Sequence, residues 1–304
     1  RKQMIISASR RTDIPAFYAE WFMNRIREGY CTVPNPFNPK QVSRISLKRG
    51  DVDVIVFWTR YARPLLPHLA ELDDRGYGYY FLYTLMNNPR ALDPKSPSHK
   101  RSLNTFRELS HRMGKEKVVW RYDPIVFTHL TDSNFHKETY QRIAEELKGY
   151  TNRSVISIVD VYRKAAKRLR RLENHGTRIT EPPKEEFSAL MKSLSASADA
   201  NKMEIHTCAE EPSLAQYGIL PGKCIDNDLI RNIGLEAADR KDPSQRAACG
   251  CVASRDIGMY ETCLFGCVYC YATANFDRAR ERHQKHDPAS PSLISPYESS
   301  FLSP

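Results

Sequence analysis

The chain has 304 residues and a mass of 35.0 kDa, with 41% hydrophobic and 27% charged residues, a balance that excludes a disordered or fibrous protein. No apolar run approaches the ~18 residues of a transmembrane helix, and no long apolar segment follows the charged start, so we expect no membrane association, no secretory signal and a cytoplasmic protein. The net charge of +10 fits an anionic substrate or partner, such as a nucleic acid or a phosphorylated metabolite.

Short runs of β-branched and aromatic residues recur along the chain, and each has about the length of a buried strand. The well-defined runs are Ile5–Ser9, Val52–Thr59, Tyr79–Leu85, Val118–Tyr122, Val155–Val159 and Met203–Thr207. A weaker seventh run lies at Asp256–Tyr260. Between the runs, apolar residues recur at helical spacing, within Phe17–Ile26, Tyr140–Leu147 and Phe187–Leu194.

Strands that alternate with helices indicate parallel βαβ units. Because a glycine-rich nucleotide fingerprint is absent, the sequence predicts an α/β fold with a TIM-type full or partial (β/α) barrel, and a doubly wound sheet is the alternative. We expect barrel units over residues 4–210, a cysteine-rich segment at 211–285 that completes the barrel, and an irregular or mobile tail at 286–304. The proline-rich segment Pro34–Pro39 is either a rim loop or a simple connection.

Polar side chains follow the predicted strands, where the catalytic residues of parallel barrels gather. The candidates for a catalytic rim are Arg10, Asp13, Arg121, Asp123, His206 and Glu210. An arginine directly after an apolar strand presents its planar fork to a carboxylate or phosphate. The simpler alternative is that strand ends are polar because they meet solvent, and His206 can equally be a structural histidine.

A basic run lies between the fifth and sixth predicted strands, with six Lys and Arg residues at positions 163–171. Cations spread over these nine positions occupy much of the circumference of a helix. We favour a solvated helix face, and an anion-binding patch is the alternative.

Eight cysteines are the most informative feature of the composition, and clustering in a reducing compartment favours metal binding over disulfides. Cys263, Cys267 and Cys270 follow a Cys-x3-Cys-x2-Cys spacing, and Gly266 permits a tight turn among them. Three thiolates can hold a [4Fe–4S] cluster and leave one iron open. The alternatives are a zinc site completed by His206 or Cys251, and no metal at all.

The remaining cysteines permit a further hypothesis. When Cys31 is set aside without a role, the thiols left are Cys208, Cys224, Cys249 and Cys251. Four thiolates suffice for an auxiliary [4Fe–4S] cluster. Alternatively, one of the four approaches the first cluster, or Cys224 is only a buried apolar residue.

The spacing from Cys263 to Cys270, with the aromatic Tyr269 before the last cysteine, resembles the signature of the radical S-adenosylmethionine (SAM) superfamily. The sequence from Thr262 to Ala272 is especially similar to that of spore photoproduct lyase, a DNA-repair member of the superfamily. The resemblance implies a [4Fe–4S] cluster whose open iron chelates SAM, reductive formation of a 5′-deoxyadenosyl radical, and a full or partial barrel. In that superfamily the motif normally follows the first barrel strand. Its place near the end of this chain suggests a circularly permuted barrel, with the run at Asp256–Tyr260 beside the first strand.

The chain as a whole resembles a prokaryotic family catalogued as domain of unknown function 1848. The matching stretches are Ile5–Pro15, Val54–Thr59, Trp120–Pro124, Cys208–Glu210 and Cys249–Tyr271. This resemblance implies iron–sulfur binding and specifies no reaction.

Three functions are therefore compared. The first is a radical-SAM-like enzyme that acts on an unidentified small-molecule or anionic substrate and takes electrons from a flavodoxin or ferredoxin, with Gly266 and Tyr269 contributing to cofactor binding. The second is an enzyme that uses the cluster to cleave another SAM bond or for redox chemistry. The third is a nucleic-acid-binding or repair protein with a structural metal, which the net charge favours.

Overall fold

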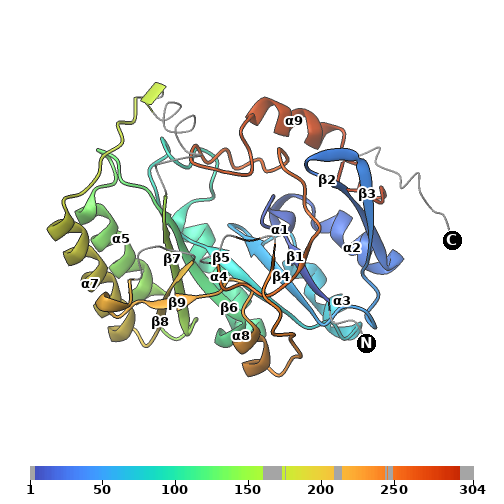
Figure 1. Cartoon of the computed structure of the whole chain (residues 1–304), viewed down its shortest axis with the longest axis horizontal. Helices are drawn as coiled ribbons and strands as arrows, with labels where there is room; N and C mark the ends of the chain where they lie inside the picture. Colours follow the sequence, from blue (N-terminus) through green and yellow to red (C-terminus); the bar gives the residue numbers. More distant parts are fainter. Residues whose placement is uncertain are drawn as a thin grey trace.

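The computed structural model describes residues 4–159, 173–174, 176–208, 214–243, 245 and 249–294. Its centre is one parallel sheet of eight strands in the order β10-β1-β4-β5-β6-β7-β8-β9 (Figure 1). The strands are β1 (Ile5–Ala8), β4 (Val54–Thr59), β5 (Tyr79–Thr84), β6 (Val118–Ile125), β7 (Arg153–Ile158), β8 (Glu204–Cys208), β9 (Leu220–Gly222) and β10 (Arg255–Asp256). Six of them match the well-defined runs to within three residues at either end. The predicted α/β class is confirmed.

The weak seventh run also forms a strand, although a shorter one. β10 pairs in parallel with β1, with Ile6 opposite Arg255 and Ser7 opposite Asp256. The strand that precedes the cysteine loop therefore lies beside the first strand, as the sequence predicts. Among the described residues, β10 and β9 are the two edges of the sheet, so the observed architecture is an open parallel sheet and closure into a barrel is not observed.

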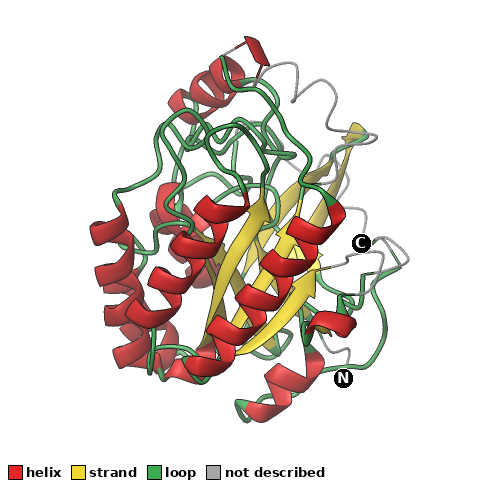
Figure 2. Cartoon of the chain, turned by 90° about the vertical axis from the view of Figure 1, so that its left-hand side faces the viewer, coloured by secondary structure: helices red, strands yellow, loops and turns green. Residues whose placement is uncertain are grey.

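Helices cover one face of the sheet, as Figure 2 shows. The helices with bounds in the described ranges are α1 (Ile14–Phe17), α2 (Ala19–Glu28), α3 (Leu69–Asp74), α4 (His99–Met113), α5 (Ser133–Glu146), α7 (Lys184–Ala200), α8 (Asn227–Asn232) and α9 (Phe276–Gln284). Short 3-10 turns lie at Leu66–His68, Lys115–Lys117 and Ala215–Tyr217. The larger core forms where alternate strand residues, such as Phe57 and Phe81, meet Phe22 of α2 and their other helical neighbours.

The opposite face of the sheet is also buried. Val54, Val56 and Tyr80 point to this face and pack against α8 and the chain around Cys224 and Cys251. We call this the inner face. Burial on both faces explains why the strands are continuously apolar runs. The described parts of the segment after β8 therefore cover the inner face and add a strand at each edge of the sheet. The sequence predicted only that this segment completes a barrel.

Two irregular regions differ from their predictions. Pro34 and Asn35 belong to an antiparallel hairpin of β2 (Tyr30–Asn35) and β3 (Asn38–Ser46), which is neither a rim loop nor a simple connection. Proline is tolerated there because the hairpin is a separate two-stranded sheet with edges on both sides. The described part of the tail, residues 286–294, is irregular but packed, since Trp21 Nε1 donates to Ser290 O over 2.9 Å.

A buried histidine in the helix-covered core leads to a pH prediction. His136 is fully buried, and its Nε2 donates to Val126 O over 3.1 Å while its Nδ1 accepts from Tyr122 Oη over 2.8 Å. Burial lowers the pKa of His136 from 6.5 to about 4, against the opposing effects of the Val126 carbonyl and of Asp132. The unfolded chain therefore takes up this proton first as the pH falls.

The stability contributed by the neutral form of His136 is complete above about pH 6.5. It is lost as the pH falls toward about 4, with a total loss of about 3 kcal/mol. Urea unfolding measured across this range will check it. A His136→Gln variant removes the titrating group and should unfold with a flatter pH profile. An unchanged slope in that variant would contradict the assignment.

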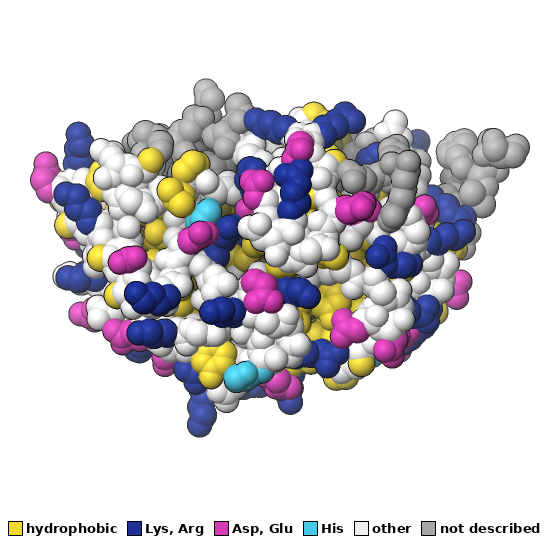
Figure 3. Space-filling model, turned by 90° about the horizontal axis from the view of Figure 1, so that it is seen from below, with side chains coloured by type: hydrophobic (Ala, Val, Ile, Leu, Met, Phe, Trp, Pro, Cys, Tyr) yellow, Lys and Arg dark blue, Asp and Glu magenta, His cyan; other side chains and the backbone are white. Residues whose placement is uncertain are grey.

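Charged side chains of both signs are interspersed on the face that carries α8 (Figure 3). The described helices include none that is long and apolar enough to cross a bilayer. The basic run at 163–171 lies outside the described residues.

Candidate functional site

The loop with Cys263, Cys267 and Cys270 lies beyond the carboxyl ends of the strands, at the same end of the molecule as α9 (Figure 1). Phe265 and Val268 anchor it in a small apolar cluster with Leu92 and Val126, and Val268 N donates to Leu92 O over 3.0 Å. Gly266 has a φ of +71°, which an L side chain rarely adopts. The loop is therefore fixed in shape before any ligand is considered.

The three thiols of this loop lie close together, so that Cys270 acts on the pKa of Cys263, and both act on the pKa of Cys267. Burial raises the pKa of Cys263 and, more strongly, that of Cys267, whereas the nearby Arg60 guanidinium acts to lower the pKa of Cys267. Backbone N–H groups of Phe265 and Asp13 are directed at the Cys263 sulfur, and Ala272 N donates to Cys270 Sγ over 3.3 Å. Such amide donors to sulfur are typical of iron–sulfur sites.

A buried polar group fastens the loop to the sheet. Asp93 accepts from Tyr269 Oη over 2.6 Å, from Asn88 Nδ2 over 2.9 Å and from Arg60 Nη1 over 3.2 Å. The Tyr269 hydroxyl also accepts from Arg60. Tyr269 was predicted to bind the cofactor, and in this arrangement its hydroxyl anchors the loop through Asp93 and Arg60. Arg60 and Asp93 were not among the predicted site residues, and the only signal for them in the sequence is that Arg60 follows a strand.

Asp13 has a structural role at the start of α1. Its carboxylate caps the helix through Ala16 N over 3.0 Å and accepts from Thr59 Oγ1 over 2.8 Å and from Arg60 N over 2.6 Å. Burial raises the pKa of Asp13 to about 7, although these hydrogen bonds act in the opposite direction. Asp13 thus joins the start of α1 to the end of β4, close to Cys263 of the cysteine loop.

Arg10 and Arg121, from different strands, stack on one tryptophan. The Cζ atoms of Arg10 and Arg121 lie 5.1 and 4.7 Å from the ring centroid of Trp58. Arg121 forms an ion pair with Asp123, which also accepts from Ser157 Oγ, and Arg10 lies 3.9 Å from Asp242. Both arginines were predicted at the rim, whereas Trp58, whose ring brings them together, was not among the predicted site residues.

Three donors of this stack are buried without a hydrogen-bond partner in the described parts of the chain, namely Arg10 Nη2, Trp58 Nε1 and Arg121 Nε. Tyr271, which follows the last cysteine of the loop, donates to Arg10 O. The rim residues Arg10, Arg121 and Asp123 are therefore brought together next to the cysteine loop.

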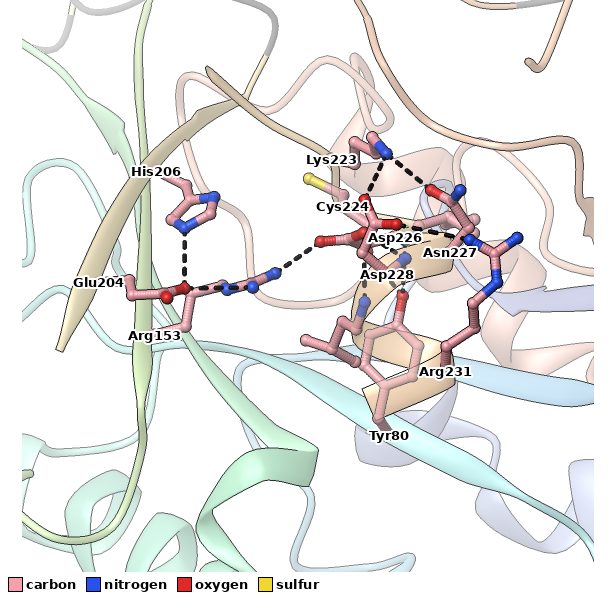
Figure 4. Close-up of polar contacts among 12 residues, drawn as sticks. Tyr80, Arg153, Glu204, His206, Lys223, Cys224, Asp226, Asn227, Asp228 and Arg231 are labelled. Carbon is pink, nitrogen blue, oxygen red and sulfur yellow. Dashed lines mark hydrogen bonds and ion pairs between the residues drawn. The ribbon is translucent and has the colours of Figure 1, made fainter. Parts of the chain in front are cut away.

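His206 lies apart from this group. Figure 4 shows it on β8 beside Glu204 and Arg153, with 3.1 Å between His206 Nε2 and Glu204 Oε2. Arg153 in turn contacts Asp226, the cap of α8, over 2.6 Å. Burial, followed by the Arg153 charge, lowers the pKa of His206. Its partners are structural ones, which supports the alternative that the sequence left open. Glu210 lies outside the described residues.

The other four cysteines come together on and beside the inner face. Cys208 ends β8, Cys224 follows β9, and Cys249 and Cys251 precede β10. Cys224 Sγ donates to Cys208 Sγ over 3.1 Å. Cys31 is buried in β2, away from both thiol groups in the sequence and in the packing, and burial raises its pKa to about 12.

As the chain is folded, no three His, Cys, Asp or Glu side chains of the described residues are arranged so that they could hold a metal ion. The donor set of the loop nevertheless fits a cluster chemically, because three thiols share one short loop with N–H donors to their sulfurs. Rotation about their Cα–Cβ bonds would be needed to direct the thiols to a common centre.

The comparisons with known proteins give one family. No curated protein matches the chain. A family model matches residues 5–272, which is most of the chain and confirms the family resemblance seen in the sequence. The matched region contains β1, the arginine–tryptophan stack and all eight cysteines. The chain therefore belongs to the family described as Domain of unknown function (DUF1848).

Proposed function

We propose that the protein is an iron–sulfur enzyme of radical-SAM-like type, in which Cys263, Cys267 and Cys270 hold a [4Fe–4S] cluster and SAM binds beside it. The observation that carries the proposal is the position of the three thiols on one rigid loop over the carboxyl ends of a parallel sheet, where α/β enzymes place their ligands. When bound, the cluster would supply the electron for reductive cleavage of SAM.

The edge strand before the loop supports this proposal. In the superfamily that the motif resembles, the motif follows the first barrel strand. Here β10 precedes the loop in sequence and pairs with β1 at the edge of the sheet. β10 is thus the first strand in space although it is the last in sequence. We infer that the open sheet is a circularly permuted partial barrel.

The chain's own residues would have distinct tasks. Arg60 and Asp93 hold the loop through Tyr269. Arg10 and Arg121 present guanidinium groups near the loop, where they would orient the carboxylate of SAM or of an anionic substrate. The apolar residues around the loop would exclude water from the reacting centre. A flavodoxin- or ferredoxin-type protein would deliver the electron.

The test uses the full chain purified without oxygen. We expect iron and acid-labile sulfide in matching amounts, and 5′-deoxyadenosine formed from SAM after reduction. Cys267→Ala should remove about four irons and abolish SAM cleavage, whereas Cys31→Ala should retain both. Methylthioadenosine as the product would indicate the cleavage of a different SAM bond and would overturn the radical-type assignment. Full iron in Cys267→Ala would overturn the cluster assignment.

A further inference from the structure

Four thiols that are distant in sequence meet at the inner face of the sheet. They come from three segments, which contain Cys208, Cys224 and the pair Cys249 and Cys251. The pKa of each thiol is affected by two of the others, and one pair, Cys208 and Cys224, has sulfurs 3.1 Å apart. We call these four residues the inner thiol group.

The backbone around the inner thiol group is held firmly. The buried hydroxyl of Tyr80 donates to Cys224 O over 2.8 Å (Figure 4). Ile225 N donates to Cys251 Sγ over 3.4 Å, and Val252 N donates to Ile225 O over 3.1 Å. Two separate segments are therefore tied together with their thiols facing the same region. Packing by itself would not require four thiols here, because any small apolar side chain would fill the space.

The charges next to the inner thiol group also require an explanation. The Arg10 guanidinium acts on Cys251 and Cys224, and the Arg121 guanidinium acts on Cys208 and Cys224. Each arginine has an acidic partner, yet one nitrogen of each remains buried without an acceptor within the described ranges. Two buried guanidinium groups favour negative charge beside them, and a metal–thiolate centre would carry such charge.

We propose that Cys208, Cys224, Cys249 and Cys251 form a second metal–thiolate site, with Arg10 and Arg121 as its neighbouring positive charges. Binding would release the thiol protons to solvent and require the side chains to turn toward one centre. Thiolates bind both the iron of iron–sulfur clusters and Zn²⁺, so the same four residues are suited to either metal. The proposal does not depend on the proposed function, because it uses none of the three loop cysteines.

The experiment measures iron, sulfide and zinc per chain in the full-length protein purified without oxygen, for the wild type and for Cys224→Ala. If the second site holds a cluster, Cys224→Ala should lose about four irons and their sulfide relative to the wild type. If it holds zinc, Cys224→Ala should lose about one zinc and keep its iron. Cys224→Ala that keeps the whole wild-type metal content would overturn the proposal.

Two further variants keep the result interpretable. Circular dichroism will report whether Cys224→Ala folds. If it folds poorly, Cys208→Ala replaces it, because Cys208 lies at the half-buried end of β8 and its removal should cause the same loss of metal. Cys31→Ala removes an equally buried thiol from another part of the core and should lose no metal. Full metal in a folded Cys208→Ala would also count against the site. Failure of the loop cluster would instead appear in Cys267→Ala, so the two proposals fail separately.

Discussion

Asp256→Ala is expected to lower the free energy of unfolding by about 3–5 kcal/mol, because this carboxylate satisfies four donors at once. It accepts from Ser9 Oγ over 2.7 Å, from Ser7 Oγ and Arg10 N over 2.8 Å, and from Gly258 N over 2.9 Å. Without it, buried hydroxyl and amide groups at the end of β1 lose their acceptor. Equilibrium urea unfolding will measure the loss.

The matched control is Arg255→Ala on the same short strand, where the side chain is exposed and a change within about 0.5 kcal/mol is expected. Gly258 belongs to the same junction. A β-carbon on Gly258 would lie 2.0 Å from Ser9 Oγ, so the chain after β10 can approach β1 this closely only with glycine. If Asp256→Ala were as stable as the control, this junction would contribute little to stability.

Asp93→Ala is the second variant with a large expected effect. Arg60 is mostly buried, with a side chain 15% exposed, and Asp93 is its acidic partner at 3.2 Å. Removal of one partner of a buried pair leaves an uncompensated charge, which costs about 3–5 kcal/mol. Because Asp93 also holds Tyr269, we expect the cysteine loop to loosen and the iron content to fall together with the stability.

Tyr269→Phe is the control for the Asp93 prediction. It removes one hydroxyl from the same group but leaves the Arg60–Asp93 pair intact, so a cost of about 1 kcal/mol is expected. Thermal unfolding and iron content, measured on both variants, separate the two effects. Equal losses in Asp93→Ala and Tyr269→Phe would show that the hydroxyl, and not the ion pair, anchors the loop.

The elements of the sheet could be predicted from the sequence because their signals are local. Runs such as Val54–Thr59 are β-branched and apolar throughout, and a strand buried on both faces needs that pattern. The cysteine loop was equally visible, since its three thiols and Gly266 lie within eight residues. The place of β10 beside β1 was predicted from the late position of the cysteine motif, compared with the superfamily that the motif resembles. The family could also be identified from linear motifs.

Only the tertiary structure decided which polar residues work together. Asp256 meets Ser7 across 249 positions, and Tyr269 meets Asp93 across 176, so no local pattern indicates either contact. His206 follows the predicted rim pattern, yet its neighbours on β7 and β8 draw it into a structural ion-pair group. The open edges of the sheet and the covered inner face depend in the same way on how distant segments pack. Local composition specifies strands and loops, whereas long-range burial and the pairing of charges determine the site.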